Sequence, residues 1–456
     1  MPDSHPAPTP DTPAPSLHGT RFFVHTFGCQ MNENDSEHMA GLLLSAGAEA
    51  APSIEESDII LINTCAVRSK SVDKVYSLLG RLKLLKQMRA VQIAVTGCVA
   101  QLHRDEILKR YAFVDLIVGP DNYPSLPELL GKSRIRPQAA TSWHSGWQEI
   151  PTGFRAKGVS GYITIMEGCN NFCSYCVVPF TRGREKFRPA VQILEEAGAL
   201  AKKGYREIQL LGQNVNVYRD PGQGTDFPIL LQELGRTPGI SWIRFITSHP
   251  RDFSRELAHA MAEVPRVCHQ LHLPIQAGSD SVLRAMSRGY TRSDYLDKVT
   301  MLRSFMPDIA LSTDIIVGFP GESAQDFEDT LHVLEQVRFT NIYSFRYSPR
   351  PRTAASRNLP DSVPLEEKRD RLSRVQSLQR QIQLEEHQAL KGRTVEVLCT
   401  GPSKKDGSVY SGRNAANQVV NFSAPLDPTG TFVRVEITGF GSYSLKGRLE
   451  PEIRTE

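Results

Sequence analysis

Apolar and polar positions follow two alternating patterns along the first third of this 456-residue chain. From Arg21 to about Leu130, short runs of β-branched and aromatic residues (RFFVHTFGC, SDIILINTC and VQIAVTGC) are each followed by a segment with helical periodicity. Strand, turn and helix in this order predict a small parallel α/β sheet. Because parallel strands end at a shared edge, residues that follow them are expected to lie close together.

Six further strand-like runs lie between about Gly161 and Ser348, from GYITIMEG to NIYSFRYS, and helical patterns separate most of them. Six β/α units in series predict an incomplete barrel. Barrels of this kind carry active sites at the carboxyl ends of their strands. A barrel with fewer than eight units also leaves a lateral gap through which a large substrate can enter.

The remaining segments complete the predicted organisation. Residues 364–390 form a highly charged helical pattern, interpreted as a solvated connector. From Lys391, short β-rich runs alternate with turn residues, which predicts a small five-stranded, OB-like barrel. The predicted fold class is therefore α/β, with a Pro-rich disordered tail (1–20), a small parallel domain (21–135), a partial barrel (155–388) and a β-barrel (391–454).

The composition of the chain says more about its expected cellular compartment than about its function. The chain has 53 basic and 50 acidic residues, so any nucleic-acid surface must be local. No apolar run reaches the length of a membrane span, and the first residues lack a secretory pattern, which predicts a cytoplasmic protein with no membrane partner. In a reducing compartment the eight cysteines are expected to be ligands, reactive thiols or core residues. No pattern indicates a dimer seam, so a monomer is predicted.

Three cysteines end the three N-terminal strand-like runs: Cys29, Cys65 and Cys98, called here the sheet-edge cysteines. Their repeated position at one point of three successive units favours a shared site. The competing interpretation is three small buried residues, since cysteine is often buried. Cys268 and Cys399 have no such pattern and are interpreted as core residues.

Three more cysteines lie within eight residues, in GCNNFCSYC: Cys169, Cys173 and Cys176, called here the loop cysteines. One loop can present three thiolates to a [4Fe-4S] cluster and leave one iron open for a small molecule. Zinc is the alternative, but no fourth ligand of suitable spacing follows. His249 and His272 are too remote to serve and are interpreted as polar residues at the barrel edge.

The loop resembles the cluster loop of the radical S-adenosylmethionine (SAM) superfamily. Together with TFGCQMNENDSE, NTCAVR, TGCVAQ, LLGQNVN, HLPIQAGSDSVLRAMSRGYT and STDIIVGFPGE, it resembles the methylthiotransferase family over nearly the whole chain beyond the tail. The resemblance implies two [4Fe-4S] clusters, with SAM at the open iron of the loop cluster and an auxiliary cluster on the sheet-edge cysteines. It also implies a C-terminal TRAM domain, Tyr175 near the adenine of SAM, and SAM contacts from Gln213 and Asn214.

The branch of the family that these motifs most resemble methylthiolates C2 of N6-dimethylallyladenosine next to the anticodon of tRNA. That activity uses two SAM molecules per turnover, one to methylate a sulfur and one to generate the radical that removes the C2 hydrogen. It implies a tRNA anticodon stem-loop as partner and a low-potential electron donor such as flavodoxin or ferredoxin. An unpaired loop base is easier to extrude than a duplex base.

Arginines near the predicted active edge and on the small barrel are candidate RNA contacts, because guanidinium groups pair with phosphates and stack on bases. Two positions depart from the expected family pattern: Arg352, where glycine is usual, and Gln418, near a usual arginine. The candidate RNA-binding residues are Arg182, Arg184, Arg346, Arg350, Arg352 and Arg413.

Three alternatives stay open at this point. A sister methylthiotransferase would modify threonylcarbamoyl-adenosine in tRNA or an aspartate of a ribosomal protein. A non-enzymatic iron-sulfur scaffold would need no SAM site. A zinc-dependent RNA-binding protein would be colourless.

Overall fold

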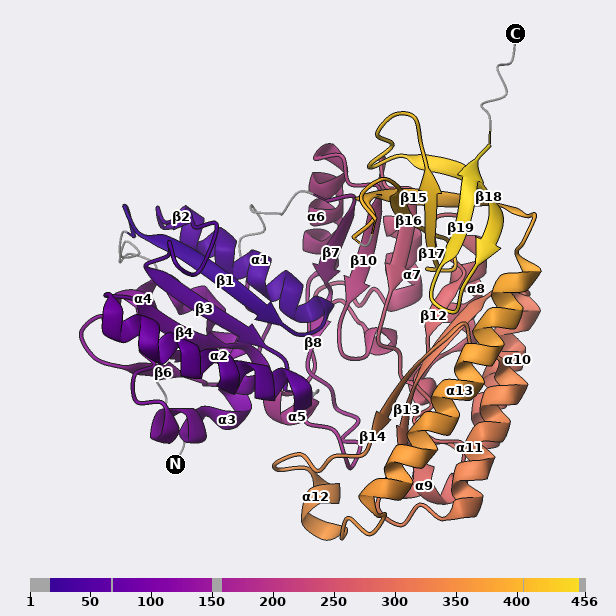
Figure 1. The fold of residues 1–456 in the computed structure, drawn as a ribbon, viewed down its shortest axis with the longest axis horizontal. Helices are drawn as coiled ribbons and strands as arrows, with labels where there is room; N and C mark the ends of the chain where they lie inside the picture. The colour runs from indigo at the N-terminus through magenta and orange to yellow at the C-terminus, as the bar shows by residue number, and fades with distance from the viewer. Residues whose placement is uncertain (1–16, 67–68, 150–157, 405, 451–456) are drawn as a thin grey trace. The chain divides into compact units, whose positions relative to one another are not determined.

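The computed structural model describes residues 17–66, 69–149, 158–404 and 406–450 (Figure 1). The chain divides into two compact units, Met1–Ala156 and Lys157–Glu456, and each is described by itself. Within the described ranges, no helix has both the length and the apolar character needed to cross a bilayer.

The first unit is built on a six-stranded sheet in which every neighbouring pair is parallel. The predicted parallel α/β domain is therefore confirmed, with three short strands added at the edges. The central strand β3 is buried at all six positions, as expected for a strand covered on both faces. In sheet order the strands are β2 (Glu49–Ala50), β1 (Arg21–Phe27), β3 (Ile59–Thr64), β4 (Gln92–Thr96), β5 (Leu116–Val118) and β6 (Gln138–Ala140).

The helices of this unit connect the strands, and the N-terminal extension joins its core. Leu17 is 1% exposed and packs in the apolar cluster that includes Phe22 and Leu43. Leu17 therefore does not belong to a disordered tail, contrary to the predicted bounds of 1–20, because it has an apolar surface to cover; residues 1–16 lie outside the described ranges. The helices are α1 (Gln30–Ser45), α2 (Ser69–Met88), α3 (Gly97–Arg110), the short 3-10 helix η1 (Pro120–Ser125) and α4 (Leu126–Ser133).

The second unit begins with six parallel strands in chain order, which confirms the predicted partial barrel. They form two three-stranded sheets, β11-β10-β7 and β12-β13-β14, and a parallel bridge between Ile243 and Val267 connects the two. Their bounds are β7 (Ser160–Thr164), β10 (Glu207–Leu211), β11 (Trp242–Phe245), β12 (Gln270–His272), β13 (Ala310–Val317) and β14 (Asn341–Arg346).

Helices between these strands bury one continuous apolar core against the outer face of the barrel. Figure 1 shows them beside the strands. The longer ones are α6 (Ala190–Lys202), α7 (Phe227–Leu234), α8 (Arg255–Glu263), α10 (Arg292–Phe305) and α11 (Ala324–Val337). The short elements are hairpin β8 (Met166–Glu167) and β9 (Lys186–Phe187), helices α5 (Val178–Thr181), α9 (Asp280–Ala285) and α12 (Ala354–Asn358), and 3-10 helices η2 (Val215–Val217) and η3 (Pro250–Asp252).

Helix α13 (Leu365–Ala389) differs from the predicted solvated connector. It contacts β14 and α11, and Val375 and Ile382 on it are buried. Its buried polar side chains serve neighbouring groups: Gln379 donates to the carbonyl of Phe339 at 3.2 Å, and Arg371 pairs with the buried Glu322 at 2.5 Å. The high content of charged residues thus obscures, in the sequence pattern, the face of α13 that packs against the barrel. Long polar side chains can be buried there because they are paired.

The C-terminal segment closes into the predicted five-stranded barrel in the order β15-β16-β17-β19-β18. It meets the amino-terminal ends of the partial-barrel strands, where Trp242, the first residue of β11, stacks edge-on against Phe432. The five strands are β15 (Thr394–Pro402), β16 (Tyr410–Asn414), β17 (Val419–Ser423), β18 (Phe432–Phe440) and β19 (Leu445–Leu449). Cys268 and Cys399 are buried, as predicted for core residues.

A buried arginine also joins these two barrels. The Arg244 side chain is 1% exposed, and its Nε donates to Glu207 at 2.6 Å. Its two Nη atoms donate to the carbonyls of Ala415 and Asn414 at 2.7 and 2.8 Å. The turn between β16 and β17 is thereby fixed to strand β11.

Asp326 links the first turns of two helices, α9 and α11. Its carboxylate accepts from Ser323, the N-cap of α11, and from Ser279 and Ser281 at the start of α9. Burial alone would raise the pKa of Asp326, but the serine hydrogen bonds outweigh it and lower the pKa to about 2. The folded state therefore holds the proton less tightly than the unfolded chain, and this contribution to stability is lost as pH falls from about 4 toward 2.

We expect Asp326→Asn to lower the free energy of unfolding at pH 7 by about 1 kcal/mol, allowing for solvent screening. The gap between parent and variant should narrow as pH falls from about 4 toward 2, because the folded carboxylate becomes protonated only near its pKa of about 2. Urea unfolding at pH 7 and at pH 2 measures both. Glu328→Gln, on the same helix in an exposed pair with Arg374, is the control and should show no comparable narrowing. A gap that stays constant with pH would contradict the assignment.

Candidate functional site

The sheet-edge cysteines follow three adjacent strands, β1, β3 and β4, at their carboxyl ends. Cys29 is the N-cap of α1, and Cys98 lies in the first turn of α3. The backbone N–H of Cys65 donates to the carbonyl of Phe27 at 2.9 Å, which joins two of the three strand ends. The structure thus brings these positions to one sheet edge, as the repeated pattern predicted.

Two features that the sequence analysis missed shape this edge. Asn32 and Asn63 are fully buried, and the amide of each donates to the other residue, at 3.1 and 2.8 Å. Gly97 has φ +85°, and a Cβ there would lie 2.7 Å from the carbonyl oxygen of Thr64. Only glycine suits this position, and its absent side chain lets the turn with Cys98 approach the end of β3.

The loop cysteines lie between the strands of the β8–β9 hairpin. Gly168 has φ +81°, and a Cβ there would meet the carbonyl oxygen of Arg184 at 2.0 Å, so the loop can fold back on itself. The Cys169 N–H donates to the Gly183 carbonyl at 3.2 Å, and the Cys176 N–H donates to the Cys173 carbonyl at 3.0 Å. These bonds draw the three thiols into one tight loop.

The loop thiols are close together and largely buried, so ionising one is opposed by burial and by any negative charge on its neighbours. Burial, with the neighbouring thiols, raises the pKa of Cys169 to about 11 and that of Cys176 to about 12. Thiolates there need a strong cationic partner such as a metal centre. Across the described ranges, no three His, Cys, Asp or Glu side chains are arranged to hold a single metal ion. A cubane binds each thiolate to a separate iron, so the donor set fits a cluster better than zinc.

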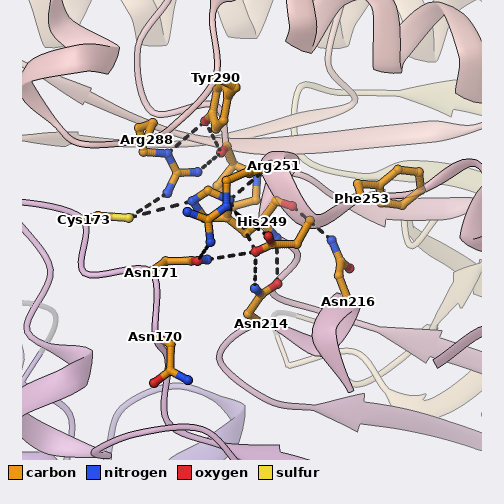
Figure 2. Close-up of polar contacts among 12 residues, drawn as sticks. Asn170, Asn171, Cys173, Asn214, Asn216, His249, Arg251, Phe253, Arg288 and Tyr290 are labelled. Carbon is orange, nitrogen blue, oxygen red and sulfur yellow. Dashed lines mark hydrogen bonds and ion pairs between the residues drawn. The ribbon is translucent and has the colours of Figure 1, made fainter. Parts of the chain in front are cut away.

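Two polar side chains from later in the chain lie beside Cys173: His249, after β11, and Arg288, after α9 (Figure 2). Arg288 Nη1 donates to Cys173 Sγ at 3.3 Å, and His249 Nε2 lies 3.8 Å from the same sulfur. The Arg251 N–H donates to His249 Nδ1 at 3.2 Å, which leaves the ring proton on Nε2, facing sulfur. Burial and the charge of Arg288 lower the pKa of His249 to about 3, so the imidazole is a neutral donor.

Asp252 anchors the loop from the other side. It accepts from Asn214 Nδ2 at 2.7 Å and from Asn171 Nδ2 at 3.1 Å. Burial opposes ionisation of Asp252, but hydrogen bonds from Asn171, Arg251 and Asn214 outweigh it and lower its pKa. The sequence analysis named Asn214 and missed Asp252, Asn171 and Arg288, since a spacing pattern does not show which polar strand ends meet.

The predicted SAM contacts have structural partners of their own. Gln213 Oε1 accepts from the Gly168 N–H at 2.5 Å, at the entrance of the loop. Tyr175 packs edge-on against Phe319, and its hydroxyl accepts from Arg288 at 3.4 Å. These contacts place both side chains beside the loop cysteines, and their contact with SAM stays a prediction.

The six candidate RNA-binding arginines have different surroundings. Arg182 is buried and pairs with Glu167 at 3.1 Å, a placement that favours a structural role. Arg184 is exposed and lies over the ring of Phe172, which is itself 45% exposed. Arg352 is exposed with φ +69°, a conformation that glycine adopts without strain, which agrees with the glycine expected there from the resemblance. Arg346 and Arg413 are exposed, and Arg350 is half-buried.

Comparisons with known proteins agree with this division. Residues 21–119 match the family described as Uncharacterized protein family UPF0004, residues 163–334 match the Radical SAM superfamily, and residues 388–449 match the TRAM domain. Among solved structures, the chain resembles the radical S-adenosylmethionine methyltransferase TsrM from Kitasatospora setae. The TM-score is 0.54 at 13% identity, over 74% of each chain, which is a likeness of fold.

Full-length relatives give a closer match. The chain is 46% identical to tRNA-2-methylthio-N(6)-dimethylallyladenosine synthase of Syntrophobacter fumaroxidans, over 94% of this chain and 95% of the relative. It is 45% identical to the enzyme of the same name from Acetivibrio thermocellus, over 94% and 90%. These matches confirm the predicted resemblance, and the chain belongs to the family of tRNA-2-methylthio-N(6)-dimethylallyladenosine synthases, which are radical SAM methylthiotransferases.

Proposed function

We propose that this chain transfers a methylthio group to C2 of N6-(dimethylallyl)adenosine next to the anticodon of tRNA. The full-length relatives carry the name of this activity. The observation that carries the proposal is the presence of two cysteine triplets, one in each unit of the chain: the sheet-edge cysteines at the carboxyl ends of three parallel strands, and the loop cysteines within the β8–β9 hairpin that follows β7. Two such sites match a reaction that needs both a sulfur donor and a radical source.

The loop cysteines would hold a [4Fe-4S] cluster with one iron open to SAM, and the sheet-edge cysteines would hold a second. The first cluster, when bound and reduced, supplies the electron that cleaves SAM to a deoxyadenosyl radical. The chain contributes the three thiols, the Gly168 turn that packs them, and the side chains of Gln213 and Asn214 that fix the loop against β10.

Polar side chains on the inner face of the barrel would suit the binding of a polar substrate. On β12 and β13, Leu271 and Ile315 point into the apolar core, whereas His272 and Asp314 alternate with them on the other face. His272 Nε2 lies 3.5 Å from Asp314, and its Nδ1 lies 3.1 Å from the hydroxyl of Ser312. Side chains of this kind can hydrogen-bond the edges of an extruded base.

Exposed arginines on the second unit would bind the tRNA backbone. Arg184 over the exposed Phe172 offers a cation and an aromatic face next to the loop cysteines. Arg346 and Arg352 flank the end of β14, and Arg413 lies on the TRAM barrel. Arginine and exposed aromatic faces together suit single-stranded RNA.

We expect Arg352→Gly to weaken tRNA binding without weakening the fold. The change removes one charge but also relieves the left-handed backbone, so the free energy of unfolding should stay within about 1 kcal/mol of the parent. The slope of log affinity against log salt should fall by about one, as expected for one lost phosphate contact. Fluorescence anisotropy at several salt concentrations measures it. Arg380→Gln, an exposed arginine on α13, is the control, and an unchanged salt slope in Arg352→Gly would remove this residue from the proposed contacts.

The activity itself is tested by mass spectrometry of nucleosides. The anaerobically reconstituted, reduced protein is incubated with SAM and one of three substrates: a dimethylallylated anticodon stem-loop, a threonylcarbamoylated stem-loop or a ribosomal-protein peptide. A methylthio group only on the first substrate supports the proposal. Product on either of the others would assign the chain to a sister activity.

We further propose three domain bounds: residues 21–135 for the N-terminal domain, 155–388 for the radical SAM core and 391–454 for the TRAM domain. The enzyme would act in the cytoplasm as a monomer with a flavodoxin or ferredoxin as electron donor.

A further inference from the structure

Arg288 is a buried cation beside the loop cysteines. It follows α9 and is 4% exposed. Its Nε donates to the Tyr290 hydroxyl at 2.9 Å and its Nη2 to the Pro274 carbonyl at 2.7 Å. Its Nη1 donates to Cys173 Sγ at 3.3 Å (Figure 2) and to the Tyr175 hydroxyl at 3.4 Å. These bonds hold the guanidinium plane in one position, with one edge against the sulfur.

Its partners set it apart from the other buried arginines of the described ranges. Each of the other four forms an ion pair with a glutamate: Arg182 with Glu167, Arg188 with Glu196, Arg244 with Glu207 and Arg371 with Glu322. The contacts of Arg288 are a carbonyl, two phenols, a thiol and the ring of Tyr290.

A buried charge is costly unless an opposite charge or strong hydrogen bonds compensate it. Arginine stays protonated, so Arg288 cannot avoid this cost by losing its proton. Of its contacts, only the Cys173 thiol becomes an anion when it ligates iron. With the loop loaded, the counter-charge of Arg288 would be the Cys173 thiolate and the cluster bound to it.

We propose that Arg288 is a positioning residue that stabilises the reduced form of the cluster on the loop cysteines through its charge and its N–H···S hydrogen bond to Cys173. The inference rests on the proposed function, because it assumes that the loop binds the cluster. A [4Fe-4S] core with three thiolates is anionic, and the electron taken from a one-electron donor adds one more negative charge. A fixed cation at sulfur favours that second state and raises the reduction potential.

His249 has a complementary part. Its Nε2 lies 3.8 Å from the same sulfur, further than the 3.3 Å of the Arg288 contact. Arg288 is therefore the nearer hydrogen-bond donor to Cys173. Arg251, the neighbouring arginine, bonds to Asn171 and Asp252 and lies at the surface, where water screens its charge.

The test is an EPR-monitored redox titration of the full-length protein in the absence of SAM and RNA. The sheet-edge cysteines are replaced by alanine so that a single cluster titrates. In this background we expect Arg288→Gln to lower the midpoint potential by at least about 59 mV, so that the reduced-to-oxidised ratio falls at least about tenfold at a fixed applied potential. Arg288→Lys, which keeps the charge and loses the guanidinium geometry, should lower it by a smaller but measurable amount, less than half as much.

Arg284→Gln, which removes an exposed charge in the last turn of α9, is the matched control and should change the reduced-to-oxidised ratio by less than twofold. An unchanged potential in Arg288→Gln with full iron content would overturn the inference, as would equal shifts in the Lys and Gln variants. If Arg288→Gln fails to retain the cluster, Arg288→Lys decides, and a potential equal to the parent's refutes the proposal. Because the titration needs no tRNA, it can fail while the methylthio assay succeeds, and the converse also holds.

Discussion

Replacing all three sheet-edge cysteines by alanine should abolish methylthio transfer while SAM cleavage continues, and replacing the loop cysteines should abolish both. In each case the lost step is expected to fall below about a thousandth of the parent rate, the scale seen when an essential catalytic group is removed. Mass spectrometry of nucleosides measures transfer, and release of 5'-deoxyadenosine measures cleavage.

The reason for this division is the separation of the two triplets along the chain, each on its own compact unit. Loss of one donor set leaves the other strand edge intact. Cys268→Ala is the control, because this cysteine is buried in the apolar contact between the two barrels of the second unit and should retain both activities if the protein folds. Continued methylthio transfer by the sheet-edge variant would show that the sulfur is carried elsewhere.

Arg244→Met is expected to lower the free energy of unfolding of the second unit by about 3–5 kcal/mol. This is the cost of leaving one partner of a buried ion pair without its counter-charge, here Glu207. The carbonyls of Asn414 and Ala415 lose their donors as well. Denaturant unfolding, followed by the fluorescence of Trp242 at this contact, would measure the change.

The double variant Arg244→Met with Glu207→Gln should recover part of that loss, because no unpaired charge is then buried. Arg434→Met serves as the surface comparison. Its side chain is 72% exposed in a pair with Glu450, and its loss should cost about 0–1 kcal/mol. Equal effects of the two single variants would show that the Arg244 pair is no stronger than a surface contact.

The sequence predicted the three-part architecture because periodicity and turn residues are local properties. The apolar runs that end in Cys29, Cys65 and Cys98 became adjacent strands, since a buried parallel strand needs an unbroken apolar run. The loop triplet was likewise visible from spacing alone, and its donor set fits the predicted cluster.

Long-range polar pairing could not be predicted in the same way. Arg288 lies 115 positions from Cys173, and no local pattern separates it from an ordinary surface arginine. The low hydropathy of α13 predicts a solvated helix. In the structure, its buried polar groups pair with carbonyls and carboxylates of other elements. The structural role of Arg182 could not be predicted for the same reason, because only the fold shows that it forms an ion pair with Glu167.

The attachment of the TRAM barrel also bears on how the chain is made. The carbonyls that accept from Arg244 lie 170 and 171 positions further along the chain, so they leave the ribosome long after strand β11. At about 5–20 residues per second, that delay is about 10–30 seconds. During this interval the nascent barrel has Glu207 as a partner for Arg244 but neither carbonyl. Translation that stops before residue 414 would release a barrel with that cation incompletely bonded and Trp242 without the Phe432 ring, a surface suited to capture by chaperones and proteases.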